Sequence, residues 1–235
     1  MTTAETEMTA FTVDTTKPVL VTGATGYVAG WIVKMLLDAG ATVHGTVRDP
    51  DNAKKVGHLT AMAEAAPGTL KLFKADLLDP QAFDAPMAGC GIVMHTASPY
   101  TLDVKDPQRD LVDPALKGTR AVLDAVNRTE SVERVVLTSS CAAIYGDVAD
   151  CAAAPGGVLT EEVWNTSSSL EHIPYSYSKT VAERAAWEMA KAQDRWRLVV
   201  INPAGIYGPS AGGPIPTSES FNIVRQIGDG TFKSG

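Results

Sequence analysis

The chain of 235 residues has few cysteines and lacks a long apolar run. Its three cysteines, Cys90, Cys141 and Cys151, do not have the spacing of metal ligands, and an odd number argues against a complete set of disulfides. We expect each to pack as a small apolar side chain in a reduced, cytoplasmic setting. No apolar stretch approaches the ~20 residues of a membrane span, and the N-terminus lacks the basic start and apolar core of a signal peptide.

An excess of positive charge is also lacking. The chain has 20 basic residues against 27 acidic ones, for a formal net charge of -7. Such a balance disfavours general binding to nucleic acid or to an anionic membrane, although a local basic pocket for one phosphate remains open. We therefore expect a small-molecule partner, no metal site, and a monomer or homodimer.

Strand patterns alternate with helix patterns along most of the chain, after a polar, Thr-rich segment (1–17) that we expect to be a mobile tail. Several strands are continuous apolar runs, as expected when both faces of a sheet are covered. The order predicts an α/β fold of the Rossmann type, a doubly wound parallel sheet over residues 18–205. The expected strands are 18–22, 41–49, 69–77, 91–98, 134–140 and 197–202, and the expected helices include 31–39, 51–65, 111–128 and 176–194.

The composition changes from about residue 206 onward. Residues 206–235 are rich in Gly, Pro and Ser, with one short helical pattern at 219–227. We expect this segment to be the start of a substrate-binding lobe. Because "GTFKSG" provides no capped element, we expect that lobe to be incomplete in this sequence.

A glycine-rich turn follows the first expected strand. In "VTGATGYVAG" the glycines fall at 23, 26 and 30, which differs from the familiar G-x-G-x-x-G spacing. Gly23 can make the tight turn, and Gly26, near the start of the next helix, lets a diphosphate approach the backbone. The free N–H groups and partial positive charge of a helix N-terminus suit that ligand. The turn therefore predicts a nucleotide site.

The end of the second expected strand, "TVRDP", bears on which dinucleotide binds. An acidic residue near this point would bind the ribose hydroxyls of NAD, whereas an Arg accommodates the 2′-phosphate of NADP. Arg48 stands there, and Lys54 and Lys55 on the following helix could add positive charge. The pattern favours NADP(H), with a solvated Arg48 paired with a nearby Asp as the alternative.

A Tyr and a Lys four residues apart occur in "IPYSYSKTVAERAAW". Tyr175 and Lys179 would share one face of a helix. The phenol has an ordinary pKa near ~10, and we expect the ammonium group to lower it and so favour acid–base chemistry. The strand-end pair Ser139–Ser140 lies about 35 residues earlier, and one hydroxyl could hold a substrate oxygen.

These motifs give the sequence a family resemblance. The glycine turn, "TVRDP", "KADLLD", "VVLTSSCAAIYG", "YSYSKTVAERAAW" and "INPAGIYGP" together resemble the extended short-chain dehydrogenase/reductase family, and in it the dihydroflavonol 4-reductase and cinnamoyl-CoA reductase-like branch of the NAD-dependent epimerase/dehydratase superfamily. That family's turn reads T-G-x-x-G-x-x-G. On this register the third glycine falls on Ala29 and not on Gly30, a departure at a position that serves helix–strand packing.

The resemblance implies a set of site residues. The catalytic residues would be Ser140, Tyr175 and Lys179, with Ser139 as the reserve for Ser140; an alignment with sugar epimerases would instead select Cys141. His95 is interpreted as a packed strand-end residue. The cofactor-binding residues would be Gly23, Ala24, Thr25, Gly26, Tyr27, Val28, Arg48, Lys55, Asp76, Leu77, Thr96, Ala97, Ser98, Tyr175, Lys179, Pro203 and Ile206.

The resemblance also implies an activity. We expect an NADPH-dependent oxidoreductase that reduces an aldehyde or ketone, including aromatic ones, or oxidises the corresponding alcohol. The alternatives are an NAD-dependent nucleotide-sugar epimerase or dehydratase, which Arg48 disfavours, and a non-catalytic dinucleotide sensor, which the presence of both Tyr175 and Lys179 disfavours.

Overall fold

The computed structural model describes residues 14–98, 104–212 and 219–231. Most of the expected N-terminal tail and parts of the expected C-terminal lobe therefore lie outside the described residues. At the start of the described chain, Lys17 forms an ion pair with Glu133, with its Nζ atom 2.5 Å from Oε1.

Six parallel strands form one sheet in the order β3-β2-β1-β4-β5-β6. This confirms the doubly wound α/β fold. The order reverses between β1 and β4, so the carboxyl ends of these two strands adjoin at the point where such sheets bind their ligands. The strands are β1 (Val19–Thr22), β2 (Thr42–Val47), β3 (Thr69–Lys74), β4 (Ile92–His95), β5 (Arg134–Thr138) and β6 (Arg197–Ile201).

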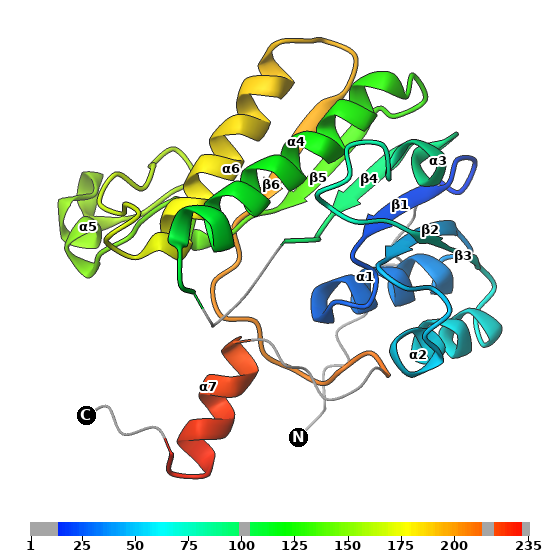
Figure 1. Ribbon diagram of the computed structural model, residues 1–235, viewed down its shortest axis with the longest axis horizontal. Coiled ribbons are helices and arrows are strands. Elements are labelled where there is room, and N and C mark those ends of the chain that lie inside the picture. The colour runs from blue at the N-terminus through cyan, green and yellow to red at the C-terminus, as the bar shows by residue number, and fades with distance from the viewer. Residues whose placement is uncertain (1–13, 99–103, 213–218, 232–235) are drawn as a thin grey trace, which may run out of the picture.

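Helices cover both faces of the sheet (Figure 1). On one face α1 (Tyr27–Asp38) and α2 (Ala53–Glu64) enclose a core built around Val21, Val33 and Leu59. On the other face α3 (Asp84–Met87), α4 (Asp113–Arg128) and α6 (Pro174–Lys191) enclose a second core. The remaining helical elements are the π-helix η1 (Gln108–Val112), the short helices η2 (Cys141–Ala143), α5 (Val148–Ala153) and η3 (Pro155–Gly157), and α7 (Glu219–Gly228).

The starts of two helices differ from those that the apolar spacing predicts. Helix α1 starts at Tyr27 instead of residue 31, because Gly26 has the extended conformation of an N-cap (φ -71°, ψ 159°) and the first turn carries no apolar periodicity. Helix α4 is preceded by η1, a rare turn with wider hydrogen bonding that sequence periodicity does not reveal. The helical pattern at 219–227 is confirmed by α7.

The cysteines are free thiols, and Cys90 is fully buried, so it packs as expected. Burial raises the pKa of its thiol to about 12. Among the helices of the described segments, none is long and apolar enough to cross a membrane. Within those same segments, no group of three or more His, Cys, Asp or Glu residues is placed to hold a metal ion.

Candidate active site

The glycine turn joins β1 to α1 and is held tightly. The N–H of Gly26 donates to the carbonyl of Gly23 at 2.8 Å, and Gly23 has a φ of +66° that favours glycine. A β-carbon at Gly23 would lie 3.0 Å from the Cβ of Ala97. Gly26 itself is exposed and offers no side chain to cap α1. The first turn of α1 is therefore a suitable cradle for a diphosphate.

The other residues of the glycine turn differ in how much of their side chains is exposed to solvent. Thr25 is exposed, and Tyr27 and Val28 are half-buried in the first turn of α1. Ala24 is fully buried, and its methyl group packs close to Gly45 of β2, so it can offer a ligand only its backbone. All of these expected residues are thus gathered at the turn, with Ala24 facing inward.

Gly30 faces a different part of the chain. Ala29, at the register of the third family glycine, is 1% exposed and belongs to the core between α1 and the sheet. A β-carbon at Gly30 would instead lie 3.8 Å from the Cβ of Ala211. Nearby, Trp31 Nε1 donates to the carbonyl of Pro209 at 2.9 Å. Gly30 thus borders the segment that follows β6, and Ala29 is a packing residue.

The end of β1 is tied to the end of β4 through one hydroxyl. Thr22 Oγ1 accepts hydrogen bonds from the backbone N–H groups of Thr96 and Ala97, each at 3.1 Å, and lies 2.9 Å from His95 Nδ1. These bonds place residues 96–98 beside the glycine turn. His95 is 1% exposed, and burial, with the charge of Lys179, lowers its pKa to about 4. Its interpretation as a packed residue is confirmed.

The residues expected to select the dinucleotide follow β2 and β3. Arg48 and Lys55 are both exposed, and no carboxylate in the described segments lies within salt-bridge distance of Arg48. Asp76 is also exposed, with its Oδ1 accepting from the N–H of Leu78 at 2.9 Å. The side chain of Leu77 packs against Gly118 of α4. The positive groups are therefore accessible, whereas the Leu77 side chain is turned into the fold.

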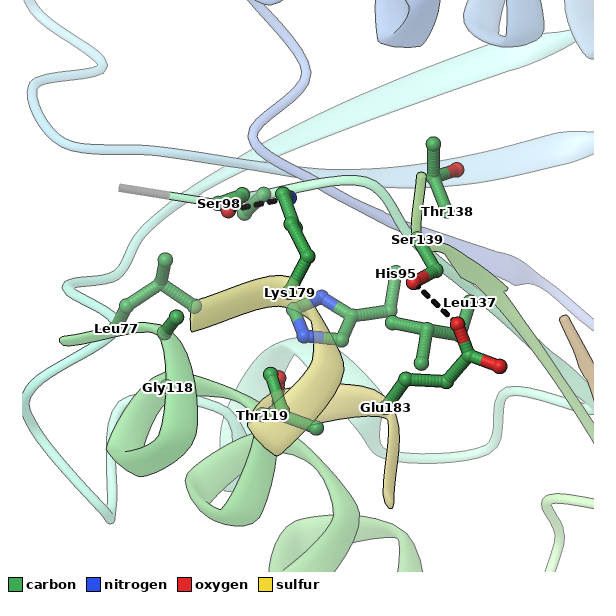
Figure 2. A pocket seen from close by; sticks show the side chains of 13 residues that line it. Leu77, His95, Ser98, Gly118, Thr119, Leu137, Thr138, Ser139, Lys179 and Glu183 are labelled. Carbon is green, nitrogen blue, oxygen red and sulfur yellow. Dashed lines mark hydrogen bonds between the residues drawn. The ribbon is translucent and has the colours of Figure 1, made fainter. Parts of the chain in front are cut away.

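Helix α6 presents Tyr175 and Lys179 one turn apart. The helix starts at Pro174, a residue that suits the first position of a helix. The residue before it, Ile173, has a left-handed backbone conformation with a φ of 50°. Lys179 Nζ donates to Ser98 Oγ at 2.8 Å, as Figure 2 shows, and lies 5.8 Å from the centre of the Tyr175 ring. The fold therefore brings the end of β4 and the start of α6 together.

The strand-end serines point to opposite sides. Ser140 forms a side-chain hydrogen bond with Tyr175. Ser139 Oγ instead donates to Glu183 Oε2 at 2.5 Å (Figure 2), and Cys141 Sγ lies 3.9 Å from the hydroxyl of Tyr145. The geometry therefore favours Ser140 over both of its alternatives.

The pKa values of the two α6 residues correct one expectation. Burial raises the pKa of Tyr175, while its hydrogen bond with Ser140 acts in the opposite direction. Burial also lowers the pKa of Lys179 to about 8. The expected lowering of the Tyr175 pKa by Lys179 is wrong for this structure, because burial raises this pKa more than the hydrogen bond with Ser140 lowers it, and the Lys179 ammonium group donates to Ser98. The Tyr175 phenol is thus protonated at neutral pH, the state that a proton donor requires.

A cavity of about 20 Å³ lies behind Lys179, enough room for roughly one water molecule (Figure 2). Polar side chains from four elements border it, among them those of His95, Thr119, Thr138, Lys179 and Glu183. Glu183 is the residue that the sequence interpretation missed. The sequence feature that could have identified it is its position eight residues after Tyr175 and four after Lys179, which places it on the same face of the helix.

The remaining expected residues follow β6. Pro203 and Ile206 are half-buried, and the carbonyl of Pro203 accepts from the N–H of Cys141 at 3.0 Å. Pro203 therefore lies beside the strand end that carries Ser140.

A parallel sheet with a glycine turn at its switch point, and a Tyr–Lys pair beside it, defines a nucleotide-binding α/β protein. The chain belongs to the NAD dependent epimerase/dehydratase family, whose profile matches residues 19–233. Its relatives place it in the extended short-chain dehydrogenase/reductase group, in the dihydroflavonol and cinnamoyl-CoA reductase-like branch.

Two plant enzymes illustrate the similarity. The chain is 47% identical over 217 residues to cinnamoyl-CoA reductase CAD2 of Medicago truncatula, an overlap of 91% of this chain and 65% of the relative. It is 42% identical over 207 residues to an anthocyanidin reductase of Vitis vinifera, an overlap of 86% and 60%. The chain thus spans somewhat under two thirds of the length of these relatives.

Solved structures show the same architecture. Gre2 from Candida albicans, in complex with NADPH, matches with a TM-score of 0.70 and 32% identity over 83% of this chain and 59% of Gre2. Vestitone reductase from alfalfa (Medicago sativa) matches with a TM-score of 0.70 and 27% identity over 90% of this chain and 63% of that protein.

Proposed function

We propose that the protein is an NADPH-dependent carbonyl reductase that converts an aldehyde or ketone to an alcohol, or catalyses the reverse oxidation. The observation that carries the proposal is the arrangement of Ser140, Tyr175 and Lys179 at the carboxyl edge of the sheet, beside the glycine turn. The reductase activities named for the plant relatives and the NADPH bound to Gre2 support it.

The residues present fit a nicotinamide dinucleotide. The uncapped N-terminus of α1 suits the diphosphate, and Gly26 leaves its approach open. We assign the nicotinamide ribose to Lys179, the adenine to the neighbourhood of Asp76 and Leu77, and the nicotinamide side to Pro203 and Ile206. When bound, the nicotinamide ring supplies the hydride.

The protein's own residues would manage the proton and the substrate oxygen. Ser140 holds the carbonyl oxygen through its hydroxyl, which lies within hydrogen-bonding distance of Tyr175. Tyr175 donates its phenolic proton to that oxygen. Lys179, with a pKa of about 8, carries a positive charge at neutral pH, and we assign its ammonium group to the nicotinamide ribose, since the pKa of Tyr175 stays raised beside it.

Arg48 supports NADPH over NADH. Its guanidinium group is exposed directly after β2, and Lys55 adds a second cation on α2. A guanidinium group can donate two hydrogen bonds to a phosphate, which NADPH has at this place and NADH lacks. We expect Arg48→Ala to weaken NADPH binding about 10- to 100-fold, the loss of a charge-assisted contact, with little effect on NADH. A preference for NADH that Arg48→Ala leaves unchanged would contradict this choice.

The activity is tested by following the near-ultraviolet absorbance of NADPH with a panel of aromatic and aliphatic aldehydes and ketones. The proposal expects NADPH oxidation that depends on the carbonyl compound. Tight NADPH binding without oxidation by any member of the panel would favour a dinucleotide sensor. Interconversion of nucleotide sugars without net cofactor oxidation would favour an epimerase.

We also assign residues 18–205 to the cofactor domain and residues 206–235 to the start of the substrate-binding lobe. The change in composition supports this boundary, and the bond from Trp31 on α1 to Pro209 is a contact between the two parts. Limited proteolysis tests it: cleavage after residue 206 should leave a fragment that still binds NADPH, and loss of binding would move the boundary.

A further inference from the structure

Glu183 is a buried carboxylate on the same face of α6 as Tyr175 and Lys179, and nothing in the proposed chemistry uses it. The residue is 6% exposed and borders the cavity behind Lys179 (Figure 2). A buried carboxylate is costly unless hydrogen bonds compensate for the lost water. Its partners therefore indicate what the residue does.

Three donors surround the carboxylate. Ser139 Oγ donates to Oε2 at 2.5 Å, and Asn202 Nδ2 donates to the same oxygen at 2.7 Å. Trp187 Nε1, one turn further along α6, donates to Oε1 at 3.3 Å. The two shorter bonds come from the segments that directly follow β5 and β6. Glu183 thus joins α6 to the carboxyl ends of two neighbouring strands.

Those strand ends carry residues of the proposed site. Asn202 Nδ2 also donates to the carbonyl of Ser140 at 3.1 Å. The N–H of Ser139 donates to the carbonyl of Ile201 at 2.8 Å, and that of Cys141 to the carbonyl of Pro203 at 3.0 Å. Backbone hydrogen bonds between residues 139–141 and 201–203 therefore continue past the ends of β5 and β6. Glu183 forms a hydrogen bond with one residue in each of these two segments.

We propose that Glu183 is a positioning residue, which through Ser139 and Asn202 holds the Ser140 hydroxyl at Tyr175 and Pro203 beside the nicotinamide site. This inference rests on the proposed reductase function. The partners of Glu183 are Ser139, Asn202 and Trp187, so it acts by fixing the backbone from which Ser140 projects. Small errors in such placement are costly, since a displacement of about 1 Å can slow a reaction on the order of 100-fold.

The test compares Glu183→Gln with Glu183→Leu. The Gln oxygen can accept the bonds from Ser139 and Asn202, so only the longer Trp187 contact is lost. Leu removes both strand-end bonds and leaves Asn202 Nδ2 only its bond to the carbonyl of Ser140. We expect kcat within about 3-fold of wild type for Gln and reduced roughly 10- to 100-fold for Leu, with KM for NADPH little changed in both. Glu188, exposed on the same helix, supplies the matched controls Glu188→Gln and Glu188→Leu, which should keep wild-type kcat.

Amide hydrogen exchange provides a readout that does not need turnover. In Glu183→Leu the amides of Ser139 and Cys141 should exchange faster, while the amides of β1 and β4 keep wild-type rates. If the wild type shows no turnover, the proposed function fails, but this exchange pattern still decides the inference.

Three results would overturn the positioning role. The first is wild-type kcat or unchanged exchange in Glu183→Leu. The second is an equal loss of kcat in Gln and Leu, which would mean that the negative charge matters and the hydrogen-bond geometry does not. The third is faster exchange throughout the sheet, which would make Glu183 a general stability residue.

Discussion

Replacing Lys179 with Met should make the protein more stable at neutral pH while abolishing turnover. Burial lowers the pKa of Lys179 from the usual 10.5 to about 8, so the folded state disfavours the charged ammonium group. Each pKa unit corresponds to about 1.4 kcal/mol, so the charged group costs roughly 3 kcal/mol of folding free energy at pH 7. Met lacks the charge and is one atom shorter, and it loses the bond from the ammonium group to Ser98, worth about 2 kcal/mol. The expected net gain is about 1 kcal/mol.

The pH dependence identifies the cause of that gain. Between the folded pKa of about 8 and the unfolded pKa near 10.5, the unfolded chain binds more protons at Lys179 than the folded chain. Wild-type stability must therefore rise with pH across this window relative to Lys179→Met. Urea unfolding at pH 7 and pH 10 should show the advantage of the Met variant falling by about 2.5 kcal/mol.

A matched control is Lys191→Met, at an exposed position in the last turn of the same helix. Its stability difference from wild type should be small and nearly equal at the two pH values. The reasoning is refuted if Lys179→Met is less stable than wild type at pH 7. A difference that does not change between pH 7 and pH 10 refutes it equally.

Three further predictions concern the glycine turn and the start of α1. Gly23→Ala and Gly40→Ala each place a side chain at positive φ, costing about 1–2 kcal/mol, but only Gly23→Ala adds a Cβ contact of 3.0 Å with Ala97. Thermal melting should therefore show a clearly larger loss of stability for Gly23→Ala than for Gly40→Ala. Equal losses of stability would mean that Ala97 moves aside at little cost. Gly26→Val should abolish NADPH binding in a fluorescence titration while the chain still folds, because Gly26 is exposed and has ordinary φ. Ala29→Gly should leave NADPH affinity nearly unchanged, and a large gain would place Ala29 at the cofactor.

The local patterns predicted the fold because each reports a short-range constraint. Alternating strand and helix patterns specified the parallel sheet, and the glycines at 23 and 26 specified the turn that starts α1. The four-residue spacing of Tyr175 and Lys179 placed them on one helical face. These features depend on periods and backbone conformations that the sequence displays directly.

Other features depended on tertiary contacts. Ser140 forms a hydrogen bond with Tyr175, whereas the hydroxyl of Ser139 donates to Glu183. The expected lowering of the Tyr175 pKa failed because burial outweighs the other influences and Lys179 donates to Ser98, a residue 81 positions away in the sequence. Gly30 and Ala211, which border each other, are even further apart in the sequence. None of these contacts produces a periodic pattern in the sequence from which it could be predicted.

The most direct test of the central proposal compares Tyr175→Phe with Tyr177→Phe. Both tyrosines lie in the first turns of α6 and are partly buried, but only Tyr175 has a lysine four residues on. With an accepted carbonyl substrate, Tyr175→Phe should lose NADPH oxidation while keeping its affinity for NADPH, because the phenol supplies the proton and not the binding energy. Tyr177→Phe should oxidise NADPH at the wild-type rate. Undiminished oxidation by Tyr175→Phe would contradict the proposal that this phenol is the proton donor.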